Sequence, residues 1–208
     1  MWEMSPRLPV PFARWLGVRS PGCSRTQRLL NGCGGWSLVE IMTVVAVAGV
    51  VAATSVPAVR SGLLDATANS AMRQVQGALR EAHEAAMTRR RTVRVDFTNP
   101  GTIQTFHMEG ADAVPLATSV LAGTMQYQAP PTGVPDTPDG FGLGPGVSFA
   151  GLMTIYFLAD GSVTDQNGVP VSGTVYLGSP GQTLVRAVTV LGPSGRVQSY
   201  RWSGRAWQ

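Results

Sequence analysis

The chain has no lysine, only two histidines and only two cysteines, Cys23 and Cys33. Both cysteines lie within the first 35 residues, so the remainder of the chain can form neither a disulfide framework nor a cysteine-based metal site. The part of the chain that would face an oxidising compartment has no cysteine. At 208 residues the chain is long enough for one anchor and one modest domain.

The sixteen basic residues are all arginines, and they are unevenly placed. Residues 1–35 contain five arginines and one acid, a net charge of +4, whereas residues 36–208 contain eleven arginines and eleven acids. The sequence pI near 9.7 therefore reflects the N-terminal segment, and the remainder is formally neutral. Because positively charged segments stay on the cytoplasmic side of a membrane, we expect residues 1–35 to be cytoplasmic.

Charge is absent from nineteen consecutive residues, Ile41 to Val59. This length suits a membrane-spanning helix, and an acid, Glu40, stands directly before it. A charge costs roughly 2.5–3.5 kcal/mol at the centre of such a helix and less near its end, so this acid requires a function. Five residues upstream, Gly34 and Gly35 offer a protease an extended backbone.

The order of these features differs from that of a conventional secretory signal, whose apolar region precedes the cleavage site. Cleavage after Gly35 would remove the polar segment and leave the apolar helix attached. Two alternatives stay open: an uncleaved membrane anchor, and a conventional signal cut near residues 52–54. For Glu40 the alternative is an interfacial acid whose carboxylate reaches the membrane surface.

Gly35, Trp36, Glu40 and the uncharged residues 41–45 resemble the type III signal of type IV pilins and type II secretion pseudopilins. The resemblance implies that a membrane prepilin peptidase cuts after Gly35 and methylates the new N-terminus at Trp36. It also implies a role for Glu40 in filament assembly. After cleavage, Trp36 carries an amine that is cationic at neutral pH, and Glu40 of a neighbouring subunit can offset the cost of burying it.

One helix is predicted from about residue 38 to about residue 88. Pro57 lies near the end of the apolar run and is expected to kink this helix. Beyond it, apolar residues recur at steps of three and four, which is typical of an amphipathic helix. The members of this stripe are Leu64, Ala68, Ala71, Val75, Leu79, Ala82 and Ala86. The small residues along this stripe would let a sheet approach the helix closely.

A period of two replaces the helical period after Arg89. Residues 93–97 and 102–108 are predicted to be strands joined by a turn. Residues 109–146 are rich in proline, glycine and aspartate, and we predict a long loop with one strand near residues 124–128. Short strands separated by turn sequences are then predicted at 147–150, 154–158, 173–177, 184–191 and 196–202. The fold class predicted is α+β, with a long N-terminal transmembrane and amphipathic helix packed on a small antiparallel β-sandwich.

Three segments of this second half, 79–97, 157–161 and 188–197, resemble the H-type pseudopilins and the FimT/FimU minor pilins. The resemblance implies a pilin-like fold with a cleaved leader at 1–35, a transmembrane segment at 36–60, the amphipathic half of the same helix at 61–90 and a periplasmic β-rich domain at 91–208. It further implies a minor pseudopilin of a type II secretion system, in a short filament tip that drives protein secretion. The alternative is a minor pilin of a type IV pilus.

The partners that the resemblance implies are prepilin peptidase, other pseudopilins or pilins in a hetero-oligomeric filament, and lipid of the bacterial inner membrane. The long loop 109–146 is expected either to carry specificity for partners, because long loops often carry binding residues, or to be a disordered spacer.

The chain offers little for catalysis. Neither His83 nor His107 has metal-ligand spacing to another histidine or to a cysteine, and a solvated surface position is predicted for each. Ser194 lies between glycines in a segment predicted to be a hairpin turn rather than a nucleophile elbow. A phosphate-binding loop and a dinucleotide fingerprint are both missing from the sequence. We therefore expect no enzymatic activity, no cofactor and no metal.

A competing function is DNA binding through the last 23 residues. This segment contains four arginines and no acid: Arg186, Arg196, Arg201 and Arg205. Tyr200, Trp202 and Trp207 interleave with them, and arginines beside aromatic rings suit phosphate contact with base stacking. Resemblance to FimT-like minor pilins of DNA-uptake machines points the same way. The other interpretation is that the arginines face solvent while the tryptophans cap the core, and a neutral mature chain weakens long-range attraction to DNA.

Overall fold

The computed structural model describes residues 36–110 and 112–208, and it describes the backbone but not the side chains of residues 56–58. Contacts divide the chain into two compact units, Met1–Gly49 and Val50–Gln208. Within the described residues, the first unit consists of the beginning of helix α1. The second unit contains the rest of α1 and all strands.

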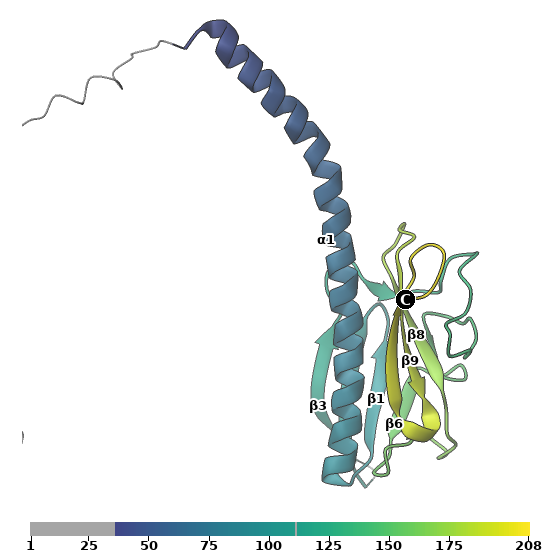
Figure 1. The fold of residues 1–208 in the computed structure, drawn as a ribbon. Coiled ribbons are helices and arrows are strands. Elements are labelled where there is room, and N and C mark those ends of the chain that lie inside the picture. The colour runs from purple at the N-terminus through teal and green to yellow at the C-terminus, as the bar shows by residue number, and fades with distance from the viewer. Residues whose placement is uncertain (1–35, 111) are drawn as a thin grey trace, which may run out of the picture. The chain divides into compact units, whose positions relative to one another are not determined.

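Helix α1 extends over 52 residues, Leu38–Arg89, as predicted from the sequence (Figure 1). Six of the seven residues of the predicted stripe are fully buried: Ala68, Ala71, Val75, Leu79, Ala82 and Ala86. Leu64 differs, because it lies one turn before the buried part of the helix and remains 36% exposed. The helix continues through Pro57. The kink predicted at this residue stays a prediction, because the side chains of residues 56–58 are not described.

The C-terminal end of α1 is closed by a residue in the left-handed region. Arg90 has a φ of 51° directly after the last helical residue, Arg89. The amide of Arg91 donates to the carbonyl of Ala86 at 3.2 Å, the six-to-one bond of a Schellman motif. The chain thereby reverses within three residues and enters the first sheet.

Five antiparallel strands form this first sheet in the order β3-β2-β1-β6-β7. Their bounds are β1 Val93–Thr98, β2 Thr102–Glu109, β3 Asp112–Val120, β6 Thr154–Phe157 and β7 Val163–Thr164. The predicted strands at 93–97, 102–108 and 154–158 are confirmed. The buried residues of β1 are Val93, Val95 and Phe97, which are the apolar members of its alternation.

Strand β3 corrects the prediction that residues 109–123 are loop. It pairs with β2 along nearly its whole length, with an irregularity opposite Thr105 and Phe106. Because β3 is an edge strand whose residues are almost all exposed, it has no apolar alternation to reveal it. Gly110, with a φ of 66°, supplies the left-handed turn that joins β2 to β3. The predicted loop is thus shorter, and it begins after β4.

The second sheet is also antiparallel and has the order β10-β9-β8-β4, with β5 pairing beside β4 on β8. Its strands are β4 Gln126–Tyr127, β5 Val147–Ser148, β8 Gly173–Gly178, β9 Val185–Leu191 and β10 Arg196–Arg201. A short 3-10 turn, η1 Gly192–Ser194, joins β9 to β10. The predicted strands are confirmed here, and Ser194 lies in the predicted hairpin connection. Besides β3, the two-residue strand β7 of the first sheet is also absent from the prediction.

The main core lies between the buried stripe of α1 and the inward faces of the two sheets. It includes Phe97, Ile103, Phe149, Phe157 and Leu177 together with the stripe. Full burial of one such large apolar side chain contributes about 1.5–3 kcal/mol. Strands β8 and β5 approach each other closely beside this core. A Cβ on Gly173 would lie 2.2 Å from the carbonyl oxygen of Ser148, so only glycine fits there. The predicted α+β class, a long helix packed on antiparallel sheets, is confirmed.

Candidate functional site

The beginning of α1 carries the predicted cleavage junction. Gly35 lies outside the described residues, and Trp36 precedes the helix with its side chain 68% exposed. The helix begins at Leu38 and has the exposed Glu40 in its first turn. A carboxylate is favourable there, because the N-terminal end of a helix carries a partial positive charge. Cleavage, methylation and the assembly role of Glu40 stay predictions.

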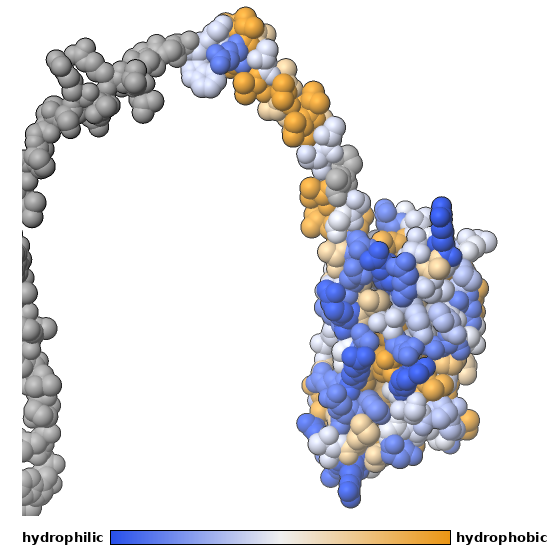
Figure 2. Space-filling view, viewed as in Figure 1, coloured by the Kyte–Doolittle hydropathy of each residue, from blue (hydrophilic) through white to orange (hydrophobic). Residues whose placement is uncertain are grey.

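The apolar start of α1 has no protein cover. Every side chain from Ile41 to Ser55 is exposed, and Figure 2 shows this helix surface mostly in the colour of hydrophobic residues. Within the described residues, α1 is the one helix long and apolar enough to cross a membrane, judged by its length and composition. An apolar surface of this extent marks contact with lipid or with other protein chains.

Hydroxyl groups in the apolar run are satisfied inside the helix. Thr43 donates to the carbonyl of Glu40 at 2.9 Å, and Ser55 donates to the carbonyl of Val51 at 2.7 Å. Thr54 donates to the same Val51 carbonyl at 3.0 Å. Such bonds remove the cost of placing a hydroxyl among lipid chains, where no water is present to pair with it.

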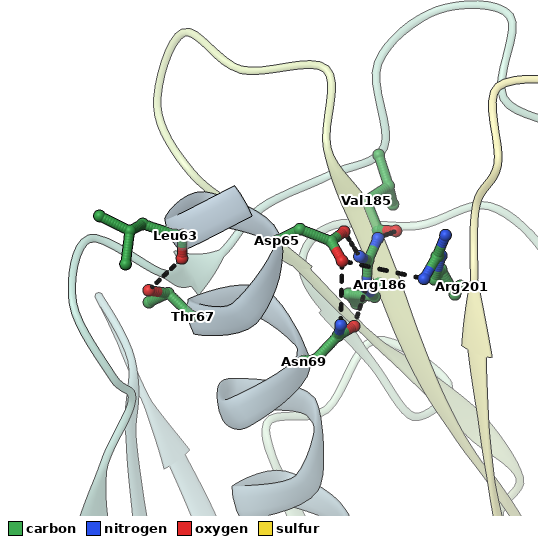
Figure 3. A network of polar contacts seen from close by, with 7 residues as sticks. All are labelled: Leu63, Asp65, Thr67, Asn69, Val185, Arg186 and Arg201. Atoms are coloured by element: carbon green, nitrogen blue, oxygen red, sulfur yellow. Dashed lines mark hydrogen bonds and ion pairs between the residues drawn. The ribbon is translucent and has the colours of Figure 1, made fainter. Parts of the chain in front are cut away.

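The C-terminal arginine cluster is divided by the structure, because Arg186 is only 1% exposed. Its Nε donates to Asn69 at 2.8 Å and its Nη1 to the carbonyl of Val185 at 3.0 Å, while its Nη2 pairs with Asp65 (Figure 3). Burial lowers the pKa of Arg186, and the Asp65 carboxylate opposes this shift. The prediction that Arg186 belongs to a DNA-binding cluster is therefore corrected, since no phosphate can reach it.

Two further arginines of the cluster face carboxylates. Arg201 lies 3.8 Å from Asp65, and Arg196 lies 3.6 Å from Asp139. Both side chains remain about half exposed, so these pairs are weak. Arg205 is exposed, and within the described part of the chain it has no ion pair. The acids come from α1 and from the loop after β4, far away in the sequence, and they reduce the local positive charge.

The aromatic residues of this segment belong to a second, smaller hydrophobic cluster. Tyr200, Trp202 and Trp207 pack against a buried group on the outer side of the second sheet, formed by Val134, Tyr176, Val185 and Ala187. The ring centroids of Trp202 and Trp207 are 5.4 Å apart. Trp207 Nε1 donates to the carbonyl of Pro135 at 3.0 Å. The interpretation in which the tryptophans cap a core is thus confirmed, and their faces are partly occupied.

The loop between β4 and β5 is ordered by one acid, Asp136. Its carboxylate accepts hydrogen bonds from the amides of Thr137 and Gly142, both at 2.7 Å, and from the hydroxyl of Tyr176 at 3.2 Å. Burial and the Asp136 charge raise the pKa of Tyr176 to about 12. This loop therefore covers the second cluster. Its role in specificity for partners stays a prediction.

Both histidines contradict the prediction of a solvated position. The ring of His83 lies 5.8 Å from that of Phe157, and a Cβ on Gly195 would come within 2.8 Å of it. Nε2 of His83 and Nδ1 of His107 are buried without hydrogen-bond partners among the described residues. Turns after β6 and β9 cover His83, and alternation on β2 directs His107 inward. In the described part of the chain, no group of three or more potential metal ligands is found.

Sequence reasoning missed Asp65 and Asn69 as partners of Arg186. They lie one helical turn apart, and Asn69 also donates to Asp65 at 3.1 Å. The available signal was two polar residues at i and i+4 where the buried stripe begins. Their partner lies 121 residues from Asp65 in the sequence, so local patterns cannot identify it.

Two solved structures and one family model are similar to this chain. A comparison with curated proteins finds no significant match. The type IV minor pilin FimU of Pseudomonas aeruginosa PAO1 is 15% identical, with a TM-score of 0.47, over 68% of this chain and 92% of FimU. The minor pseudopilin EpsH from the type 2 secretion system of Vibrio cholerae is 13% identical, with a TM-score of 0.43, over 64% of this chain and 96% of EpsH.

A family model described as type II transport protein GspH matches residues 71–195. The match covers more than half of the 208 residues, from near the start of the buried stripe of α1 to the turn before β10. The chain belongs to the GspH family of pilin-like proteins.

Proposed function

We propose that this chain is a minor pseudopilin of a type II secretion system, anchored in the bacterial inner membrane by residues 41–59. The observation that supports this most directly is the GspH match over residues 71–195. The matched part of α1 continues without a break into the exposed, uncharged first half of the same helix. The basic residues 1–35 stay in the cytoplasm and the β-rich unit enters the periplasm. The chain acts as a structural subunit and a substrate of prepilin peptidase, without catalysis of its own.

In this proposal, prepilin peptidase cuts after Gly35 and methylates the amine of Trp36. Cleavage creates a cation next to a helix whose own acid, Glu40, has no partner within the described chain. In a filament, Glu40 of one subunit then pairs with the Trp36 amine of a neighbour. Each charge offsets the cost of burying the other, so assembly depends on prior cleavage.

The cleavage step is tested by expressing the chain with and without a prepilin peptidase. Mass spectrometry of the N-terminus is expected to find a peptide that begins at methylated Trp36 only when the peptidase is present. Changing Gly35 to Leu should prevent cleavage without removing the chain from the membrane. An unprocessed chain in the presence of the peptidase, or a cut near residues 52–54, would contradict the proposal.

The assembly role is tested by changing Glu40 to Val in the cell that carries the secretion system. We expect normal cleavage but poor incorporation into filaments, measured by shearing or cross-linking with the other pseudopilins. Glu40→Gln is the matched control, since it keeps the shape of the side chain and also removes its charge. Full incorporation of both variants would exclude charge pairing.

The alternative function is a FimT- or FimU-like minor pilin of a type IV pilus. Deletion of the gene separates the two, because loss of protein secretion with intact surface pili supports the secretion system and the reverse result supports the pilus. DNA binding belongs to this alternative and would rest on Arg196, Arg201 and Arg205. A mobility shift of duplex DNA at low salt that disappears in Arg196→Ala and Arg201→Ala variants would support it.

A further inference from the structure

The last residues of the chain form a compact turn at the end of the second unit that carries residues 60–64 of α1. This C-terminal turn, residues 201–208, is closed by two backbone hydrogen bonds between Arg201 and Gln208, at 2.8 and 2.9 Å. It borders a groove of about 570 Å³ with Ser61 and Leu64 of the helix on another side. Trp202, Ser203 and Gly204 line that groove.

The position of this contact along the helix gives its depth relative to a membrane. The nineteen uncharged residues up to Val59 span about 28 Å of helix, close to the roughly 30 Å hydrocarbon core of a bilayer. Ser61 and Leu64 then lie about 3–8 Å beyond the hydrocarbon, within the layer of lipid headgroups. The C-terminal turn shares this depth because it borders the same groove. This step rests on the proposed membrane anchor.

The chemistry of the turn suits that layer. Arg60, Arg201 and Arg205 are all exposed, and Asp65, which lies 3.8 Å from Arg201, is also paired with the buried Arg186. These four arginines and one aspartate leave a net charge of +3. Leu63 is 61% exposed, so exposed apolar side chains of the helix continue past Arg60. Arginines with half-buried tryptophans are typical of the membrane interface.

We infer that Arg60 and the C-terminal turn form a docking surface for the phosphate groups of anionic phospholipids. The arginines contact the headgroups, while Leu63 and the exposed edges of Trp202 and Trp207 lie at the boundary of the acyl chains. The surface holds the β-rich unit against the bilayer until the subunit leaves it. Lipid phosphate fits better than DNA, because the tryptophans are packed together and against the second cluster and do not offer free faces to bases.

The test uses the full chain reconstituted in vesicles, with Cys23 and Cys33 changed to Ser. A fluorophore is attached at Ala206→Cys in the turn, or at Ser194→Cys at the opposite end of β10, about 17 Å away along the strand. Lipids with a nitroxide on the headgroup serve as quenchers. We expect several-fold stronger quenching at position 206 than at 194, in vesicles that contain phosphatidylglycerol.

Arg205→Gln and Arg60→Gln should each lower the ratio of docked to undocked turn about fivefold, since one arginine at an anionic surface contributes about that factor. Arg80→Gln, an exposed arginine far along α1, is the matched control and should leave the ratio unchanged. High salt should weaken the quenching as well.

Alkaline extraction of the vesicles separates the two proposals. If the chain is extracted, the membrane anchor fails and the docking surface fails with it. If the chain stays in the vesicles but positions 206 and 194 are quenched equally, or phosphatidylglycerol has no effect, the docking surface alone is overturned. Displacement of the 206 probe from the vesicles by duplex DNA would assign the arginines to nucleic acid instead.

Discussion

Arg186 places a cation in an almost fully buried position, and the carboxylate of Asp65 offsets part of its desolvation cost. The strand β9 directs Arg186 toward α1, where Asp65 and Asn69 accept its hydrogen bonds (Figure 3). Such a pair adds little net stability when intact, because desolvation opposes attraction. It becomes costly when only one partner is removed, and this asymmetry can be measured.

We expect Asp65→Ala to lower the free energy of unfolding by about 3 kcal/mol, because it leaves the Arg186 cation buried without a counter-charge. Arg186→Met removes that charge, keeps the length of the side chain and should cost much less. The double variant should therefore be more stable than Asp65→Ala alone. Arg201→Ala is the control for the exposed pair and should cost less than about 1 kcal/mol. Denaturation in detergent measures all four, and equal losses for Asp65→Ala and Arg186→Met would contradict this account.

The stability that Tyr176 contributes through its contact with the loop between β4 and β5 depends on pH. Its pKa is raised from 10.0 to about 12 by burial, so the folded state holds the phenol proton more tightly than the unfolded state. The resulting stability is fully present below pH 10.0 and is lost as the pH rises toward about 12. We expect the free energy of unfolding to fall over this window, and Tyr176→Phe to make the fall shallower. A pH dependence in Tyr176→Phe identical to that of the unchanged chain would exclude this role.

At the scale of elements, α1 ends with a residue in the left-handed conformation, a position that glycine normally occupies. Arg90 adopts a φ of 51° at the position after the helix, and a side chain there is strained. Arg90→Gly should therefore raise the free energy of unfolding by about 0.5–1 kcal/mol. Arg89→Gly, one residue earlier and inside the helix, should lower it by a similar amount. Thermal unfolding compares the two, and a loss of stability in both would contradict the strain at Arg90.

Strand β3 shows why an element can be invisible to pattern analysis. Alternation reveals a strand when one of its faces is buried, as in β1 and β2. The edge strand β3 has exposed residues on both faces and contains Pro115, so composition favours a loop. Its existence depends on β2, to which the turn at Gly110 returns the chain. Only pairing across the sheet makes it a strand.

At the scale of the whole molecule, Asp65 sets the shortest fragment of the second unit that keeps the counter-charge of Arg186. A soluble fragment that starts at Ala66 lacks the counter-charge of Arg186, whereas one that starts at Ser61 keeps it. We expect fragment 61–208 to be more stable than fragment 66–208 by about 3 kcal/mol. Arg186→Met should restore most of the loss in the shorter fragment. Chemical denaturation of these three proteins tests the boundary, and similar midpoints for all of them would exclude it.

The helix, most strands and the candidate junction follow from the sequence because their signals are local. A stripe at steps of three and four places Ala68 to Ala86 on one face, and nineteen uncharged residues after Glu40 indicate a membrane helix wherever the rest of the chain packs. The difference in net charge between residues 1–35 and 36–208 likewise follows directly from the sequence.

Only the tertiary structure decided the fate of individual polar residues. Arg186 and Arg201 look alike in the sequence, yet packing of β9 against α1 buries the first and leaves the second half exposed. His83 is half-buried, with its Nε2 fully covered, because two turns from distant strands close over it. The physical reason is the same in each case: burial and ion pairing depend on neighbours that are distant in the sequence, while periodicity reports only on neighbours within a few turns or strands.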